Sequence, residues 1–247
     1  MSRANQIVCA LLLIYNLLTL RTRAQSIDQD SAITRMAFDK AVLQYHTGLA
    51  PESGLYRGSE YVVYAQFLKE GHPFFDKDHM RNGSVLYNGI LYKDLPLVYD
   101  LVKDLVVTYA PMRAFKIALI NELIDSFTIE NHIFIRLKDS LNPSAPRPGY
   151  YELIYKGGIC ILKKEKKTIR EEVGREYIEK FIDDVVSYYL KKGNTWYPVN
   201  NKRSLLHSLG DRNKEARKFM RRNSLNMSED KENALLKIAA WYDGSTQ

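Results

Sequence analysis

The chain has 247 residues, of which 45% are hydrophobic and 26% are charged, and its net charge is +7. Three of its basic residues lie within the first 24 positions, so residues 25–247 carry 33 basic and 29 acidic side chains, a net charge of +4. This small excess excludes the strongly basic composition typical of nucleic-acid-binding proteins, and we expect no nucleic-acid partner. The hydrophobic content is enough for one packed domain of ordinary size.

Residues 1–24 have the composition of a cleaved secretory signal peptide. Arg3 precedes an apolar run over residues 7–20, and small side chains occupy the positions before the expected cleavage site after Ala24. The run is shorter than the roughly 20 residues that a membrane-spanning helix needs. Cleavage is therefore favoured over a retained anchor, an alternative suggested by the two arginines that follow the run. We expect the mature chain to begin at Gln25 and to be exported.

Cysteine content limits how the mature chain can be stabilised. The only cysteine after residue 24 is Cys160, so an intramolecular disulfide is impossible even in an oxidising compartment. Its neighbours on a predicted strand are aliphatic, which is typical of a small buried thiol and not of a nucleophile. Burial of apolar side chains must then supply the stability.

Residues 25–82 show little periodicity and are interrupted by glycine and proline. We expect an irregular segment that packs on the sheet, with a strand or short helix over residues 60–68. Residues 33–43 fit a helical spacing.

Asn88-Gly89 predicts a tight β-hairpin, because both residues of such a turn must adopt positive φ. The two flanking runs, residues 85–87 and 90–92, are apolar. A two-residue turn also sets the cross-strand pairs: Val85 with Tyr92, Leu86 with Leu91 and Tyr87 with Ile90.

Further short apolar runs predict an antiparallel meander. The strands are expected at residues 97–101, 105–109, 116–120, 127–129 and 132–137. Three prolines place residues 141–148 in a surface loop. Two more hairpins are expected, joining residues 150–155 to 159–162 and residues 185–190 to 195–199. The pattern of residues 171–184 fits a helix as well as a strand.

After residue 200 the apolar spacing becomes helical. A short helix over residues 204–209 should end at Gly210. Asp211 is expected to cap a helix that runs to residue 223, and Ser228 a last helix that runs to residue 241.

The predicted fold class is mainly β with α (α+β), an antiparallel meander that forms a sandwich or half-barrel and is capped by C-terminal helices. Its predicted parts are the signal peptide (1–24), the irregular segment (25–82), the antiparallel β domain (83–200) and the helical segment (201–247).

Residues 83–104 (GSVLYNGILYKDLPLVYDLVKD) and 188–211 (YYLKKGNTWYPVNNKRSLLHSLGD) resemble segments of uncharacterised exported proteins of Bacteroidetes. The resemblance implies a secreted or cell-envelope setting, in the periplasm or on the surface of a Gram-negative bacterium. It carries no activity, cofactor or catalytic residue with it.

One short segment combines four potential metal ligands, His72, Asp76, Asp78 and His79. Imidazoles and carboxylates suit zinc or a harder cation. Their spacing matches neither a zinc-enzyme helix nor a calcium loop, so solvated turn residues are the favoured interpretation. No serine lies in a nucleophile elbow and no glycine-rich phosphate loop follows a strand. We therefore predict no metal, no cofactor and no catalytic residues.

The helix expected after Gly210 has a basic outer surface, which suits anionic lipid or polysaccharide in an exported protein. A face that serves only solubility is the alternative. The basic residues are Arg212, Lys214, Arg217, Lys218, Arg221 and Arg222.

These features favour a non-enzymatic exported envelope protein with a binding or structural role. Its partner would be envelope lipid, polysaccharide or another envelope protein, and an apolar ligand could occupy the concave face of the sheet. One alternative is a hydrolase of an envelope polymer whose site is assembled from separate loops. Another is an adaptor that docks on membranes through the basic helix.

Circular dichroism of the processed protein should show a β-dominated spectrum, and chelators should leave its melting temperature unchanged. Both results follow if apolar burial alone stabilises the fold. A predominantly helical spectrum, or melting on addition of a chelator, would contradict this expectation.

Overall fold

The computed structural model describes residues 54–65, 68–138, 142–174 and 177–244. These residues belong to one compact unit that begins at Gly54. The expected signal peptide and the expected helix over residues 33–43 lie outside the described residues.

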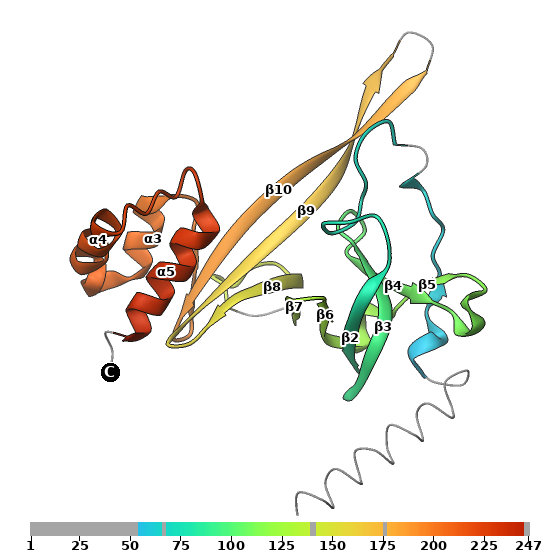
Figure 1. Ribbon diagram of the computed structural model, residues 1–247, viewed down its shortest axis with the longest axis horizontal. Helices are drawn as coiled ribbons and strands as arrows, with labels where there is room; N and C mark the ends of the chain where they lie inside the picture. The colour runs from blue at the N-terminus through green and yellow to red at the C-terminus, as the bar shows by residue number, and fades with distance from the viewer. Residues whose placement is uncertain (1–53, 66–67, 139–141, 175–176, 245–247) are drawn as a thin grey trace, which may run out of the picture. The chain divides into compact units, whose positions relative to one another are not determined.

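Eleven strands form one antiparallel sheet in the order β1-β5-β4-β3-β2-β6-β7-β8-β9-β10-β11 (Figure 1). The sheet is open and helices follow it, which confirms the α+β fold class. The strands are β1 (Ser59–Glu60), β2 (Arg81–Tyr87), β3 (Ile90–Asp100), β4 (Leu105–Tyr109), β5 (Lys116–Ala118), β6 (Ile124–Ile129), β7 (His132–Leu137), β8 (Gly149–Lys156), β9 (Ile159–Val173), β10 (Ile178–Lys192) and β11 (Thr195–Pro198).

Most neighbouring strands in the sheet are also consecutive in the chain, as in a meander. The exceptions are β1 with β5 and β2 with β6. A short 3-10 helix, η5 (Asn121–Leu123), precedes β6, which returns to pair with the free edge of β2. The expected meander is therefore interrupted between β5 and β6, because β2 offers a second edge whose inward side chains, Val85 opposite Phe127, share one core.

The hairpin of β2 and β3 has the predicted register. Val85 pairs with Tyr92, Leu86 with Leu91 and Tyr87 with Ile90. The turn residues Asn88 and Gly89 have φ values of 49° and 77°, the left-handed conformation that this turn needs. The expected strand over residues 97–101 is the second half of β3, which continues through Pro96.

The segment over residues 60–68 differs from expectation. β1 ends at Glu60, and Tyr61 and Tyr64 instead turn their hydroxyls toward Asp100, at 2.7 and 2.8 Å. Over residues 61–64, hydrogen bonds to a buried carboxylate thus replace regular structure.

Within residues 171–184, whose pattern fits a helix as well as a strand, residues 171–173 lie in β9 and residues 178–184 lie in β10. The two strands pair continuously from Val173 with Ile178 to Ile159 with Lys192. Opposite charges meet across the pair, as in the ion pair of Glu171 with Lys180 at 2.9 Å. Such cross-strand pairs favour a ladder over a helix for a densely charged segment.

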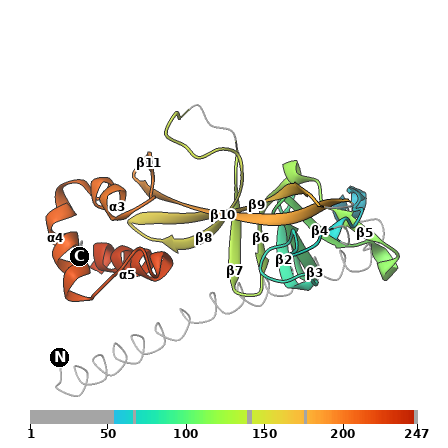
Figure 2. The same cartoon turned by 90° about the horizontal axis from the view of Figure 1, so that it is seen from above.

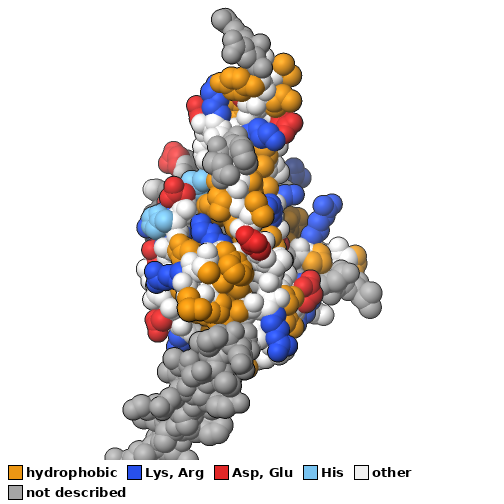
Figure 3. All heavy atoms as spheres, turned by 90° about the vertical axis from the view of Figure 1, so that its right-hand side faces the viewer, with side chains coloured by type: hydrophobic (Ala, Val, Ile, Leu, Met, Phe, Trp, Pro, Cys, Tyr) orange, Lys and Arg blue, Asp and Glu red, His pale blue; other side chains and the backbone are white. Residues whose placement is uncertain are grey.

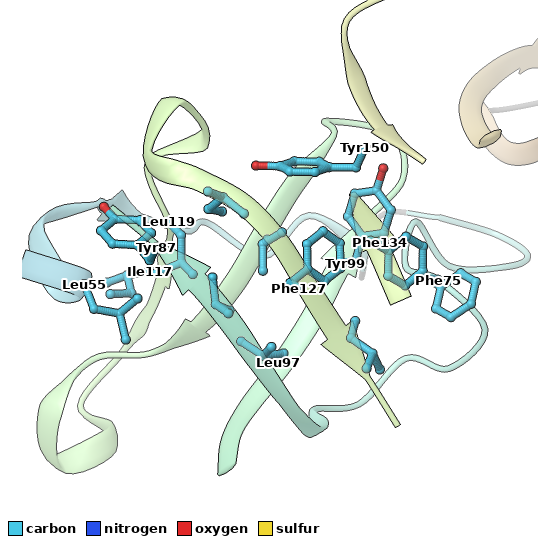
Figure 4. Close-up of a cluster of buried hydrophobic side chains, with 14 of the residues drawn as sticks. Leu55, Phe75, Tyr87, Leu97, Tyr99, Ile117, Leu119, Phe127, Phe134 and Tyr150 are labelled. Carbon is cyan, nitrogen blue, oxygen red and sulfur yellow. The ribbon is translucent and has the colours of Figure 1, made fainter. Parts of the chain in front are cut away.

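Aromatic and aliphatic side chains together fill the inner face of the curled sheet (Figure 4). Phe127 stacks on Phe134 with ring centroids 4.6 Å apart, and meets Tyr150 and Tyr99 edge-on at 5.2 and 5.3 Å. None of the four rings is more than 3% exposed. This side of the sheet is therefore occupied by the protein's own side chains.

Three α-helices form a second core with β8 to β11, and Figure 2 shows them gathered beside these strands. They are α3 (Lys202–Ser208), α4 (Asn213–Arg222) and α5 (Lys231–Gly244). The carboxylate of Asp243 fixes α5 to the turn before β9, accepting hydrogen bonds from Tyr155 Oη at 2.7 Å and Gly158 N at 3.0 Å. A Cβ atom at Gly157 would lie 1.8 Å from this carboxylate, so a larger residue there would displace the Asp243 side chain.

Two predicted helix caps were wrong. Asp211 lies within a 3-10 turn, η6 (Gly210–Arg212), and α4 has no side-chain cap. Asp230, not Ser228, caps α5, because its carboxylate accepts a hydrogen bond from Asn233 N at 3.1 Å. In both cases the chain continues past the expected cap before the helix begins.

Phe127→Ala should lower the free energy of unfolding by about 3–5 kcal/mol, because it leaves a cavity among buried rings. Leu91→Ala is the control, since Leu91 is 49% exposed, and should change the free energy by less than about 1 kcal/mol. Urea denaturation measures both. Equal effects would contradict the placement of Phe127 at the centre of this core.

Candidate functional site

Ionisable side chains gather where β7 to β10 meet the first turn of α5. Lys163 on β9 is their centre, because its Nζ lies 3.3 Å from Glu152 Oε2 and 3.2 Å from Glu232 Oε2. Burial lowers the pKa of Lys163, but the two carboxylates outweigh this effect and hold the pKa above its ordinary value. Lys163 is therefore charged, and it links the sheet to α5.

His132 extends this cluster to β7. Its Nδ1 lies 2.5 Å from Glu152 Oε1. The side chain of Glu152 is 7% exposed, whereas that of His132 is 39% exposed. The ring of Phe75 meets the imidazole edge-on at 4.9 Å, so a carboxylate and an aromatic ring both orient it.

Burial affects two further groups beside Lys163. It raises the pKa of Glu165, although Lys163 and Lys167 partly oppose the shift. It also raises the pKa of Tyr188 to about 12, with a further contribution from Glu232, whose Oε2 accepts a hydrogen bond from the tyrosine hydroxyl at 3.2 Å. The cluster therefore lies in a partly water-excluded region.

An imidazole held by a carboxylate is an arrangement that can accept or donate a proton at its other nitrogen. Nucleophilic catalysis would also need a hydroxyl or thiol within reach. Over the described residues, His132 makes no hydrogen bond to serine, threonine or cysteine. The other oxygen of Glu152 faces Lys163, so the cluster connects β7, β8, β9 and α5.

The four potential metal ligands of residues 72–79 do not converge. Asp76 pairs with Arg81 at 2.9 Å, and His79 Nδ1 lies 3.4 Å from its neighbour Asp78. His72 instead stacks on Phe74. In the part of the chain that the structure describes, no three His, Cys, Asp or Glu side chains are placed to hold a metal ion.

The predicted basic helix is α4, and packing fixes its orientation. Ala216 and Met220 are at most 1% exposed in the helical core. The residues on the opposite side of the helix must then face solvent. They include five cations, all exposed: Lys214, Arg217, Lys218, Arg221 and Arg222.

Arg212 differs from the other five residues predicted to form the basic surface. Its guanidinium lies over the rings of Trp241 and Tyr242, 4.7 and 4.6 Å from their centroids, and donates a hydrogen bond to Tyr242 O at 2.9 Å. Arg212 therefore helps to hold α4 against α5. By contrast, none of the five cations on α4 forms an ion pair within the described residues.

No protein-family model, curated protein or solved structure matches the chain. Among the helices that the structure describes, none is both long and apolar enough to cross a bilayer.

Sequence analysis missed the cluster around Lys163 because its members lie far apart in the chain. The register places Lys163 opposite Glu152 on one side and Tyr188 on the other. Once those pairings are known, the alternation of side chains along strands identifies the cluster. The sequence shows the alternation of side chains along each strand, but it does not show which residues of β8 and β10 pair with β9.

Lys163→Met should lower the free energy of unfolding by about 3 kcal/mol, because two partly buried carboxylates lose their shared cation. Lys166→Met is the matched control, since Lys166 is exposed on the same strand, and should change it by less than about 0.5 kcal/mol. Chemical denaturation at neutral pH compares the two. Similar losses of unfolding free energy would show that the cluster does not stabilise the contact between the sheet and α5.

Proposed function

We propose that the protein is an exported, non-catalytic envelope protein that docks on anionic membrane lipid through the exposed face of α4. One observation carries the proposal: five exposed cations share this face, without an anionic partner in the described part of the chain. In an exported protein, phosphate-bearing headgroups are a partner of opposite charge.

The spacing of the cations suits a flat surface. Residues 214, 217, 218, 221 and 222 follow the i, i+3, i+4, i+7, i+8 pattern of a single helical stripe. The buried residues Ala216 and Met220 lie on the other side. All five cations can therefore approach one plane of headgroups without unpacking α4.

Electrostatic docking of this kind is additive and sensitive to salt. Each Lys or Arg close to an anionic bilayer strengthens binding roughly fivefold at moderate ionic strength. Several such contacts together give useful affinity without a pocket, and they weaken as salt shortens the Debye length.

Two other functions receive less support. An apolar ligand within the curled sheet would compete with the rings of Tyr99, Phe127, Phe134 and Tyr150, which already pack there. The pair of His132 with Glu152 favours a hydrolase. However, the same carboxylate also faces Lys163 and so helps to hold the sheet against α5. Surface binding uses residues for which the fold has no other evident need.

Reversing the charge of α4 tests the proposal. The variant Arg217→Glu, Lys218→Glu, Arg221→Glu, Arg222→Glu should bind vesicles of phosphatidylglycerol and phosphatidylethanolamine at least about 100-fold more weakly than the wild type. Co-sedimentation measures this affinity, and salt should weaken wild-type binding. Phosphatidylcholine vesicles should bind neither protein.

The matched control changes net charge equally at exposed positions elsewhere: Arg57→Glu, Lys93→Glu, Lys156→Glu, Lys166→Glu. It should keep most of the wild-type affinity, because the cations of α4 remain together. Equal losses of vesicle affinity in both variants would show that net charge, and not the arrangement of cations on α4, controls binding. Absence of binding by the wild type would refute the proposal outright.

A further inference from the structure

The β1 edge of the sheet carries exposed apolar side chains. Tyr61 N donates a hydrogen bond to Lys116 O at 2.8 Å, which continues the pairing of β1 with β5 by one residue. By this register Val62 comes opposite Phe115. Val62 is 70% exposed and Phe115 is 48% exposed, and the next residue, Val63, is 38% exposed.

The neighbouring loop presents a further apolar side chain in a strained conformation. The loop contains a 3-10 turn, η4 (Pro111–Arg113), and is closed by a hydrogen bond from Ala110 N to Phe115 O at 2.8 Å. Met112 and Arg113 have φ values of 59° and 53°. Two successive left-handed residues other than glycine are unfavourable. The fold nevertheless keeps this loop, in which the Met112 side chain is 98% exposed.

Cations lie next to these apolar side chains in the chain, or over aromatic rings next to them in the chain. Arg113 lies over the ring of Tyr109, 5.7 Å from its centroid, and Lys103 Nζ lies 4.1 Å from the ring centroid of Tyr64. Lys116 follows Phe115 directly. Within the described residues none of these three cations forms an ion pair, and the one acidic side chain on β1 is that of Glu60.

We propose that the loop over residues 110–115, with Val62 and Val63 beside it, inserts into the headgroup region of an anionic bilayer. Met112 and Phe115 enter the boundary of the acyl chains, while Arg113 and Lys116 meet lipid phosphates. Figure 3 faces the end of the unit that carries β4 and β5, and shows hydrophobic side chains beside Lys and Arg side chains. The inference rests on the proposed function for its partner, but on different residues.

Charge complementarity selects lipid over an added protein strand. A strand added at this edge would be held by backbone hydrogen bonds and would need no cations around it. A bilayer interface requires both components, apolar side chains for the acyl boundary and cations for the phosphates. Residues 112–116 supply both, because Met112 and Phe115 are apolar and Arg113 and Lys116 are cations.

Met112→Asp, Phe115→Asp should weaken binding to vesicles of phosphatidylglycerol and phosphatidylethanolamine at least about tenfold, because it removes the apolar contribution. The matched control is Leu91→Asp, Ile133→Asp, whose parent side chains are 49% and 45% exposed. The measurement is repeated near 1 M NaCl, where the Debye length falls to about 3 Å and the contribution of α4 is screened. The loop variant should lose the vesicle binding that remains at this salt concentration, and the control variant should keep that binding.

A second measurement reports insertion directly. An environment-sensitive fluorophore on Met112→Cys, in a Cys160→Ala background of the mature chain, should shift its emission to the blue when these vesicles are added. The same label on Leu91→Cys should not shift. If the aspartate variant fails to fold, Met112→Ser with Phe115→Ser replaces it.

The outcomes separate this inference from the role of α4. Vesicle binding that the loop variant leaves unchanged, or an unshifted label on bound protein, overturns the inference and leaves the proposed function standing. Binding that depends on the loop but survives charge reversal of α4 refutes the proposed function and supports the inference. If the wild type self-associates in the absence of vesicles and the loop substitutions abolish this self-association, the partner is protein and the inference is overturned. Absence of binding by the wild type refutes both.

Discussion

The hydrogen-bonded ladder between β9 and β10 contacts both the C-terminal helices and the segment that packs on the core of the first strands. At one end Ile161 and Leu190 are buried beneath the C-terminal helices. Further along the same strand, the Lys167 ammonium donates hydrogen bonds to His72 O at 3.1 Å and Phe74 O at 2.9 Å. These carbonyl groups belong to the segment that packs on the first core. Because one uninterrupted strand carries both sets of contacts, a slip in its register would detach both at once.

Most buried side chains that could act as acids, bases or ligands are instead bonded to partners that stabilise the fold. Asp100 is completely buried, and its carboxylate accepts hydrogen bonds from two tyrosine hydroxyls and from the backbone N–H groups of Val102 and Lys103. The side chain of Arg81 is 2% exposed, and it bonds Asp76 and Phe75 O. His132, Glu152 and Lys163 form the same kind of arrangement. Buried ionic groups need such partners merely to be tolerated, so the charged groups without partners lie on the surface.

The surface has two cationic regions that differ in composition. On α4 the cations form a continuous stripe above a buried face, and no large apolar side chain interrupts it. Around residues 110–115 the cations are fewer and border exposed apolar side chains. The first arrangement suits contact by charge alone, and the second suits insertion beside charge. A protein carrying both would respond to lipid charge and to lipid packing through separate residues.

Local chemistry in the sequence determined the β2–β3 hairpin, because Asn88-Gly89 specifies both the turn and the register. It also determined the buried stripes of α4 and α5, because helical spacing needs no distant partner. Only the tertiary structure decided that β6 pairs with β2, that residues 171–173 and 178–184 form strands, and that His132, Glu152 and Lys163 meet. These outcomes depend on which distant edges share a core, and the free energy of that burial is not encoded in any local pattern.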